Sequence, residues 1–100
     1  MFLVVANVDV KLGESESFLK DLDEYIAILL KNEPGTVFFD VYKKALDIKE
    51  GAEQYAILEG YTDEIAYEDH AKSEYRMHHL EKIRSHLSDG SAAQFISVEA

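Results

Sequence analysis

The residues of this sequence best suited to chemistry are one histidine and two tyrosines in its second half. Tyr67 and His70 are three residues apart in a segment of helical character, so their side chains point the same way. Tyr61 ends the apolar stretch before them. An imidazole suits a general base at neutral pH, and a tyrosine hydroxyl suits a donor to an oxyanion. The alternative interpretation is a His–Tyr pair whose polar atoms bond to the backbone at a helix end.

Asn7 is a further candidate because it is a polar residue inside an otherwise apolar segment near the start of the chain. A buried asparagine must hydrogen-bond, either to a molecule in a pocket or to a neighbouring side chain. Phe39 is a candidate for the wall of such a pocket. Like Tyr25 and Tyr42, it also fits a core position or a contact between subunits.

Other kinds of site lack support in the sequence. The four histidines are His70, His78, His79 and His86, and no H-E-x-x-H motif or convergent set of three ligands accompanies them, so no metal site is predicted. The absence of cysteine removes thiolate ligands, thiol nucleophiles and disulfides. No G-x-G-x-x-G, P-loop or G-x-S-x-G motif is present, which argues against nucleotide, flavin and hydrolase sites.

These residues must be positioned by alternating strands and helices. Apolar periodicity and turn residues predict strands at 2–11, 36–46, 54–61 and 94–98 and a helix at 15–32. A second helical region starts at a cap on Thr62 or Asp63, breaks near 71–73 and continues through Leu87 until it closes at 89–91. The order β-α-β-β-α-β predicts an α+β fold, with a four-stranded antiparallel sheet and the helices on one face.

Composition places limits on partners and location. One hundred residues predict a single domain covering 1–100. The net charge of −10 repels phosphate backbones and anionic lipid heads, so neither nucleic acid nor a membrane is the expected partner. The apolar start of the chain is too short for a signal peptide or a membrane span, and we therefore expect a cytoplasmic protein.

Two strands are apolar on both faces, although the helices can cover only one face. Residues 2–10 supply apolar side chains to both sides, and so do residues 37–42. Leaving several of them in water would forfeit roughly 1.5–3 kcal/mol each. A second copy of the same sheet, packed face to face, would cover them, so a homodimer is predicted.

The sequence resembles the antibiotic biosynthesis monooxygenase domain, a family of dimeric α/β-barrel proteins with a ferredoxin-like fold. The resemblance covers nearly the whole chain, and three segments carry it: Val4–Val8, Glu33–Thr36, and Leu58–Asp63 followed by Ala66, His70 and Ser73. It implies a homodimer with one pocket between each sheet and its own helices. It also implies oxidation of a small aromatic or quinol-type substrate by O2 without flavin, haem or metal, so no cofactor is expected.

On this resemblance His70 matches the recurring histidine of the family, and Tyr67 matches a tyrosine of the branch that oxidises anthrones. Three positions depart from the family pattern. Tyr61 stands in place of a tryptophan, Ile57 in place of an asparagine and Tyr75 in place of a second histidine. The predicted catalytic set is therefore His70, Tyr67 and Asn7, with Tyr61, Ile57 and Phe39 binding the substrate.

Alternatives remain within the same scaffold. In the haem-degrading branch, Asn7 would match a pocket asparagine and His78 or His79 would lie near the haem ligand, but the chain has no tryptophan for that pocket. The protein could instead be a ligand-binding or stress-related dimer without catalysis, or a structural subunit with no cavity between helices and sheet.

Overall fold

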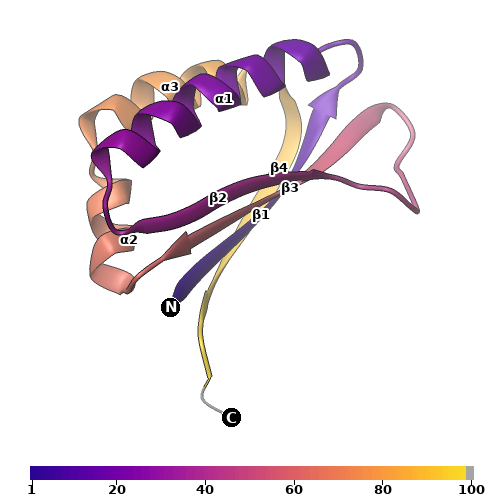
Figure 1. The fold of residues 1–100 in the computed structure, drawn as a ribbon. Coiled ribbons are helices and arrows are strands. Elements are labelled where there is room, and N and C mark those ends of the chain that lie inside the picture. Colours follow the sequence, from indigo (N-terminus) through magenta and orange to yellow (C-terminus); the bar gives the residue numbers. More distant parts are fainter. Residues whose placement is uncertain (99–100) are drawn as a thin grey trace.

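Four strands form one antiparallel sheet in the order β2-β3-β1-β4, and three helices pack on one side of it (Figure 1). The structure is a computed structural model that describes residues 1–98. Its elements are β1 (Phe2–Lys11), α1 (Ser15–Asn32), β2 (Thr36–Lys43), β3 (Ala52–Tyr61), α2 (Glu64–Ala71), α3 (Glu74–Arg84) and β4 (Leu87–Ile96). The predicted α+β fold of ferredoxin-like type, with helices on one face, is confirmed.

Helix α1 has the predicted bounds, and its apolar stripe forms much of the core. Phe18, Leu22, Tyr25 and Leu29 recur every three or four residues and are all buried. They pack against buried side chains of β1, β2 and β3 and against Ile83 of α3. None of the described helices is both long and apolar enough to cross a bilayer.

The second helical region divides as the sequence predicts. The Asp63 side chain accepts a hydrogen bond from the backbone N–H of Ala66 at 2.8 Å and caps α2. The helix ends at Ala71, and α3 begins at Glu74 in a new direction. This break separates a short helix beside the sheet end from a longer helix that lies along α1 (Figure 1).

Several predicted boundaries are wrong, including the end of the last strand, which stops at Ile96 rather than at 98. The second strand ends at Lys43 rather than at 46, and the third begins at Ala52 rather than at 54. The larger error concerns β4, which begins at Leu87, so that Leu87 is not helical and residues 89–91 lie inside the strand. The physical reason is the length of β1, since each of its backbone groups needs a partner and β4 pairs along it from Leu87 to Ile96.

The two faces of the sheet differ in what covers them. Phe2, Val4, Ala6, Val8 and Val10 point toward the helices, and the alternate residues of β1 point away. No described helix covers this second face, which we call the open face (Figure 1). The strand register places apolar side chains on it from all four strands: Leu3, Val5, Phe38, Tyr42, Leu58 and Phe95.

Candidate functional site

His70 occupies the last turn of α2 and is buried against the sheet, with 3% of its surface exposed. The helix stops directly after it. The Ser73 hydroxyl donates to the His70 carbonyl oxygen at 2.8 Å and stabilises the turn into α3. The helix break therefore fixes the backbone that carries the imidazole.

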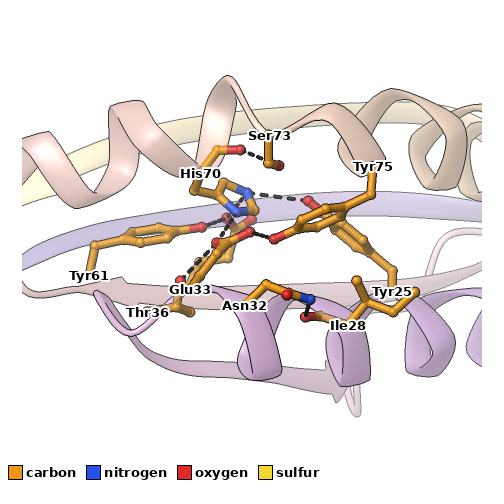
Figure 2. A network of polar contacts seen from close by, with 10 residues as sticks. Tyr25, Ile28, Asn32, Glu33, Thr36, Tyr61, His70, Ser73 and Tyr75 are labelled. Atoms are coloured by element: carbon orange, nitrogen blue, oxygen red, sulfur yellow. Dashed lines mark hydrogen bonds and ion pairs between the residues drawn. The ribbon is translucent and has the colours of Figure 1, made fainter.

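Glu33 lies in the turn between α1 and β2, and this turn packs against α2, which carries His70. Gly35 in this turn lies so close to α2 that a Cβ atom there would be 2.6 Å from the Cβ of Ala66. The Thr62 N–H also donates to the Gly35 carbonyl oxygen at 2.9 Å. This contact brings Glu33 Oε1 to 2.7 Å from His70 Nδ1 (Figure 2).

Glu33 accepts hydrogen bonds from three side chains. Besides His70, the Thr36 hydroxyl donates to Oε1 at 3.0 Å and the Tyr75 hydroxyl donates to Oε2. Because a carboxylate only accepts, the contact with Glu33 assigns a hydrogen to Nδ1 of His70. A neutral His70 then carries its lone pair on Nε2, and this atom can accept a hydrogen bond or a proton.

The Nε2 side of His70 faces two further groups. The Tyr25 hydroxyl lies 3.4 Å from Nε2, and Glu59 Oε1 lies 3.8 Å from it. Tyr61, which is fully buried, donates to Glu59 at 2.5 Å. Burial raises the pKa of Glu59, although the Tyr61 hydrogen bond opposes the rise. Burial also raises the pKa values of Tyr25 and Tyr61, so both are phenols at neutral pH.

A cavity of about 560 Å³ adjoins this cluster, between the sheet and the helices. The volume is in the range of small-molecule sites. His70, Tyr67 and Glu59 supply polar groups to its lining. Its charged residues also include Arg76 and Arg84 from α3 and Asp89 from β4. The apolar lining includes Val4, Ala6, Val8, Phe39, Ile57 and Leu80. The site therefore combines a carboxylate-held imidazole with a largely apolar space.

The structure brings together most of the residues predicted from the sequence. His70, Tyr67, Ile57 and Phe39 line the cavity. Tyr61 does not line it but packs behind His70, with ring centroids 5.2 Å apart.

Asn7 does not join them, which corrects the expectation that it shapes the same pocket. It is exposed on the open face, opposite Ala56 and Ser91. The reason is the two-residue period of β1, which turns Asn7 away from the helices.

Sequence reasoning missed the residues that hold His70 in place. Glu33 carried a signal, since it opens the Glu33–Thr36 segment, but that segment was interpreted as a turn and as part of the family resemblance, with no role in the site. Glu59 carried a weaker signal, as an acidic residue at a helix-facing position of an apolar strand. Tyr25 was interpreted as a core residue or a contact between subunits, and its hydroxyl contact with His70 joins residues 45 positions apart in the sequence.

The other histidines lie apart from the cavity. His78 is exposed, while His79 is buried and stacks on Tyr25 at 5.5 Å. His86 follows α3 and contacts Glu14 at 3.0 Å and Asp21 at 2.7 Å, and these hydrogen bonds raise its pKa. Within residues 1–98, no three His, Asp or Glu side chains are arranged to hold a metal ion.

The fold is shared with solved structures from several organisms. A candidate antibiotic biosynthesis monooxygenase from Caulobacter crescentus is 22% identical, with a TM-score of 0.82 over 98% of this chain and 90% of that one. A conserved protein from Methanosarcina mazei is 22% identical, with a TM-score of 0.81 over 94% and 89%. A candidate antibiotic biosynthesis monooxygenase from Nitrosomonas europaea is 15% identical, with a TM-score of 0.82 over 99% and 100%.

The sequence itself also gives a family match. No curated protein is significantly similar to the chain. The family model for antibiotic biosynthesis monooxygenases, in contrast, matches residues 1–82. This match includes β1, the Glu33 turn, β3, His70 and most of α3. The chain therefore belongs to the antibiotic biosynthesis monooxygenase family.

Proposed function

We propose that the protein oxidises a small aromatic or quinol-type molecule with O2, without an organic or metal cofactor, and that His70 is the base. Membership of the family supports a monooxygenase-like function. The observation that carries the proposal is the His70–Glu33 contact of 2.7 Å at the wall of the cavity. A carboxylate on Nδ1 orients the ring and stabilises the imidazolium that forms when Nε2 takes a proton.

The reaction that fits this arrangement starts with a phenol or enol bound near Nε2. His70 removes its proton, and the electron-rich anion transfers electrons to O2. For a quinol, one oxygen atom enters the ring and the other leaves as water, so quinol plus O2 yields hydroxyquinone plus water. The substrate supplies all four electrons, and no external reductant is needed. The apolar part of the cavity lining lowers the polarity around the bound anion.

Tyr67 and Tyr61 have different parts in this proposal. Tyr67 lines the cavity and directs its hydroxyl toward Gln94, with Nε2 of Gln94 at 3.5 Å, so it is in reach of a bound molecule. Tyr61 lies behind Glu59 and His70 and acts as a positioning residue. Ile57 and Phe39 supply the apolar surface on which an aromatic ring would lie.

We also propose that the protein forms a homodimer in which the open faces of two copies pack against each other. Tyr42 and Phe95 on this face are 57% and 51% exposed, and Phe38 and Leu58 are half-buried beside them. Apolar patches of this extent mark interaction surfaces. Sedimentation equilibrium at micromolar concentration tests this part, and a monomeric protein would contradict it.

Oxygen uptake tests the catalytic proposal directly. The wild type is expected to consume O2 with at least one member of a panel of hydroquinones and anthrones, above the rate of autoxidation. His70→Ala is expected to lose about 10²–10⁴-fold of that rate. The matched control is His78→Ala, because His78 is exposed on α3. No uptake with any compound would favour a ligand-binding protein, and full activity of His70→Ala would refute the role of His70.

A further inference from the structure

Both arginines of the chain lie in the lining of the cavity and give it positive charge. The chain has only two arginines, Arg76 and Arg84, in a sequence with a net charge of −10. Both belong to α3 and both line the cavity. Eight residues of helix place their backbones about 12 Å apart, so they supply charge to two parts of one cavity.

Within residues 1–98, neither guanidinium has a carboxylate partner, although acidic residues outnumber basic ones two to one in the sequence. Among the ion pairs formed within residues 1–98, none includes an arginine. The Nε atom of Arg76 is buried and has no hydrogen-bond acceptor. A buried charged donor without an acceptor is unfavourable, and a ligand that brings an acceptor would relieve this.

Two acidic residues, Glu59 and Asp89, also line the cavity, and each already accepts a hydrogen bond. Glu33 accepts from three side chains, and Glu59 accepts from Tyr61. Asp89 on β4 accepts from the Gly90 N–H at 2.8 Å. The Arg76 guanidinium is close enough to Tyr25 to oppose the rise in the pKa of that hydroxyl, but it forms no ion pair within residues 1–98, so it can still bind an anionic group inside the cavity.

We propose that the cavity takes a planar hydroxyaromatic carboxylic acid, whose carboxylate binds Arg76 while its hydroxyl lies at His70. The inference rests on the proposed function, because it uses the same cavity and the same base. A guanidinium matches a carboxylate with two parallel hydrogen bonds, and the apolar walls accept the ring. Arg84 adds positive potential that draws in the anion.

Ligand binding measured by calorimetry tests the inference without any need for turnover. The probes are 3-hydroxy-2-naphthoic acid and 6-hydroxy-2-naphthoic acid, compared with 2-naphthol, which has the same ring and hydroxyl but no carboxylate. At least one acid is expected to bind the wild type about tenfold or more tightly than 2-naphthol. Equal or weaker binding of both acids would overturn the inference.

Substitutions then assign the effect to Arg76. Arg76→Gln is expected to weaken binding of the preferred acid about tenfold or more and to leave 2-naphthol within about twofold. Arg76→Lys keeps the charge but not the planar fork, and should recover part of the loss. The matched control is Lys82→Gln, which removes one positive charge from an exposed position of the same helix outside the cavity lining.

The outcomes separate this inference from the proposed function. If Lys82→Gln weakens the acid as much as Arg76→Gln, or if Arg76→Gln weakens 2-naphthol equally, recognition by Arg76 is refuted. If the acid binds through Arg76 but O2 uptake is absent, the inference stands and the monooxygenase proposal fails. If O2 uptake requires His70 but neither acid binds more tightly than 2-naphthol, the monooxygenase proposal stands and the inference about Arg76 fails.

Discussion

Removing the Glu33 carboxylate should destabilise the protein far more than removing any exposed carboxylate. Glu33 accepts hydrogen bonds from His70, Thr36 and Tyr75. His70 and Thr36 are 3% and 8% exposed, so their donors cannot turn to water in Glu33→Ala. Each buried donor left unpaired costs about 1–3 kcal/mol. With a smaller contribution from half-buried Tyr75, the expected loss is about 3–5 kcal/mol.

Glu33→Gln gives a graded test of the same reasoning. The amide oxygen can still accept from His70 and Thr36, and the amide nitrogen can donate to the Tyr75 hydroxyl, whose hydrogen can rotate away. The three bonds survive but lose the contribution of a charged acceptor. We expect a loss of about 1–2 kcal/mol, which is smaller than in Glu33→Ala.

Urea unfolding at a fixed protein concentration measures both losses, since the free energy of unfolding of such domains is about 5–15 kcal/mol. The matched controls are Glu24→Ala and Glu24→Gln at an exposed position of α1, each expected to stay within about 0.5 kcal/mol of the wild type. If Glu33→Ala also lies within about 1 kcal/mol of the wild type, Glu33 does not organise the cluster as described.

Two further predictions concern other parts of the fold. Gly35→Ala should lose about 1–3 kcal/mol, because its Cβ would lie 2.6 Å from the Cβ of Ala66, and adding Ala66→Gly should restore part of the melting temperature. Failure of that rescue would refute the close contact. His86→Gln should lose up to about 1 kcal/mol near pH 5–6. Since the pKa of His86 is raised in the folded protein, its stabilisation is complete below the unfolded value of 6.5 and fades as pH rises through the folded value. A difference from wild type that grows with pH in melting curves would contradict this.

The predictions from sequence succeeded where a single element decides the outcome. The bounds of β1 and α1 follow from local periodicity and turn residues, and residue type placed the helix cap at Thr62 or Asp63, of which Asp63 forms it. The predicted boundary between α3 and β4 was wrong because it depends on how two strands pair and not on one element alone. Leu87 continues the helical spacing of Leu80 and Ile83, but pairing with the whole length of β1 stabilises it as a strand.

The candidate site divides in the same way. His70 and Tyr67 could be singled out because their spacing on a short helix is local. Glu33 could not be paired with His70, since 37 residues separate them and the contact depends on how the turn before β2 packs on α2. Asn7 was assigned to the site because residue type alone does not say which face of a central strand a side chain occupies.

The sequence by itself therefore determined the order of elements, the amphipathic stripe of α1 and the family motif around His70. The tertiary structure alone decided which carboxylate holds the imidazole, that both arginines meet one cavity, and that Asn7 lies on the far side of the sheet. The physical reason is the distance along the chain over which each kind of interaction acts. Propensity and periodicity act over a few residues, whereas strand register and helix packing join residues far apart in the chain, and these set the geometry of a site.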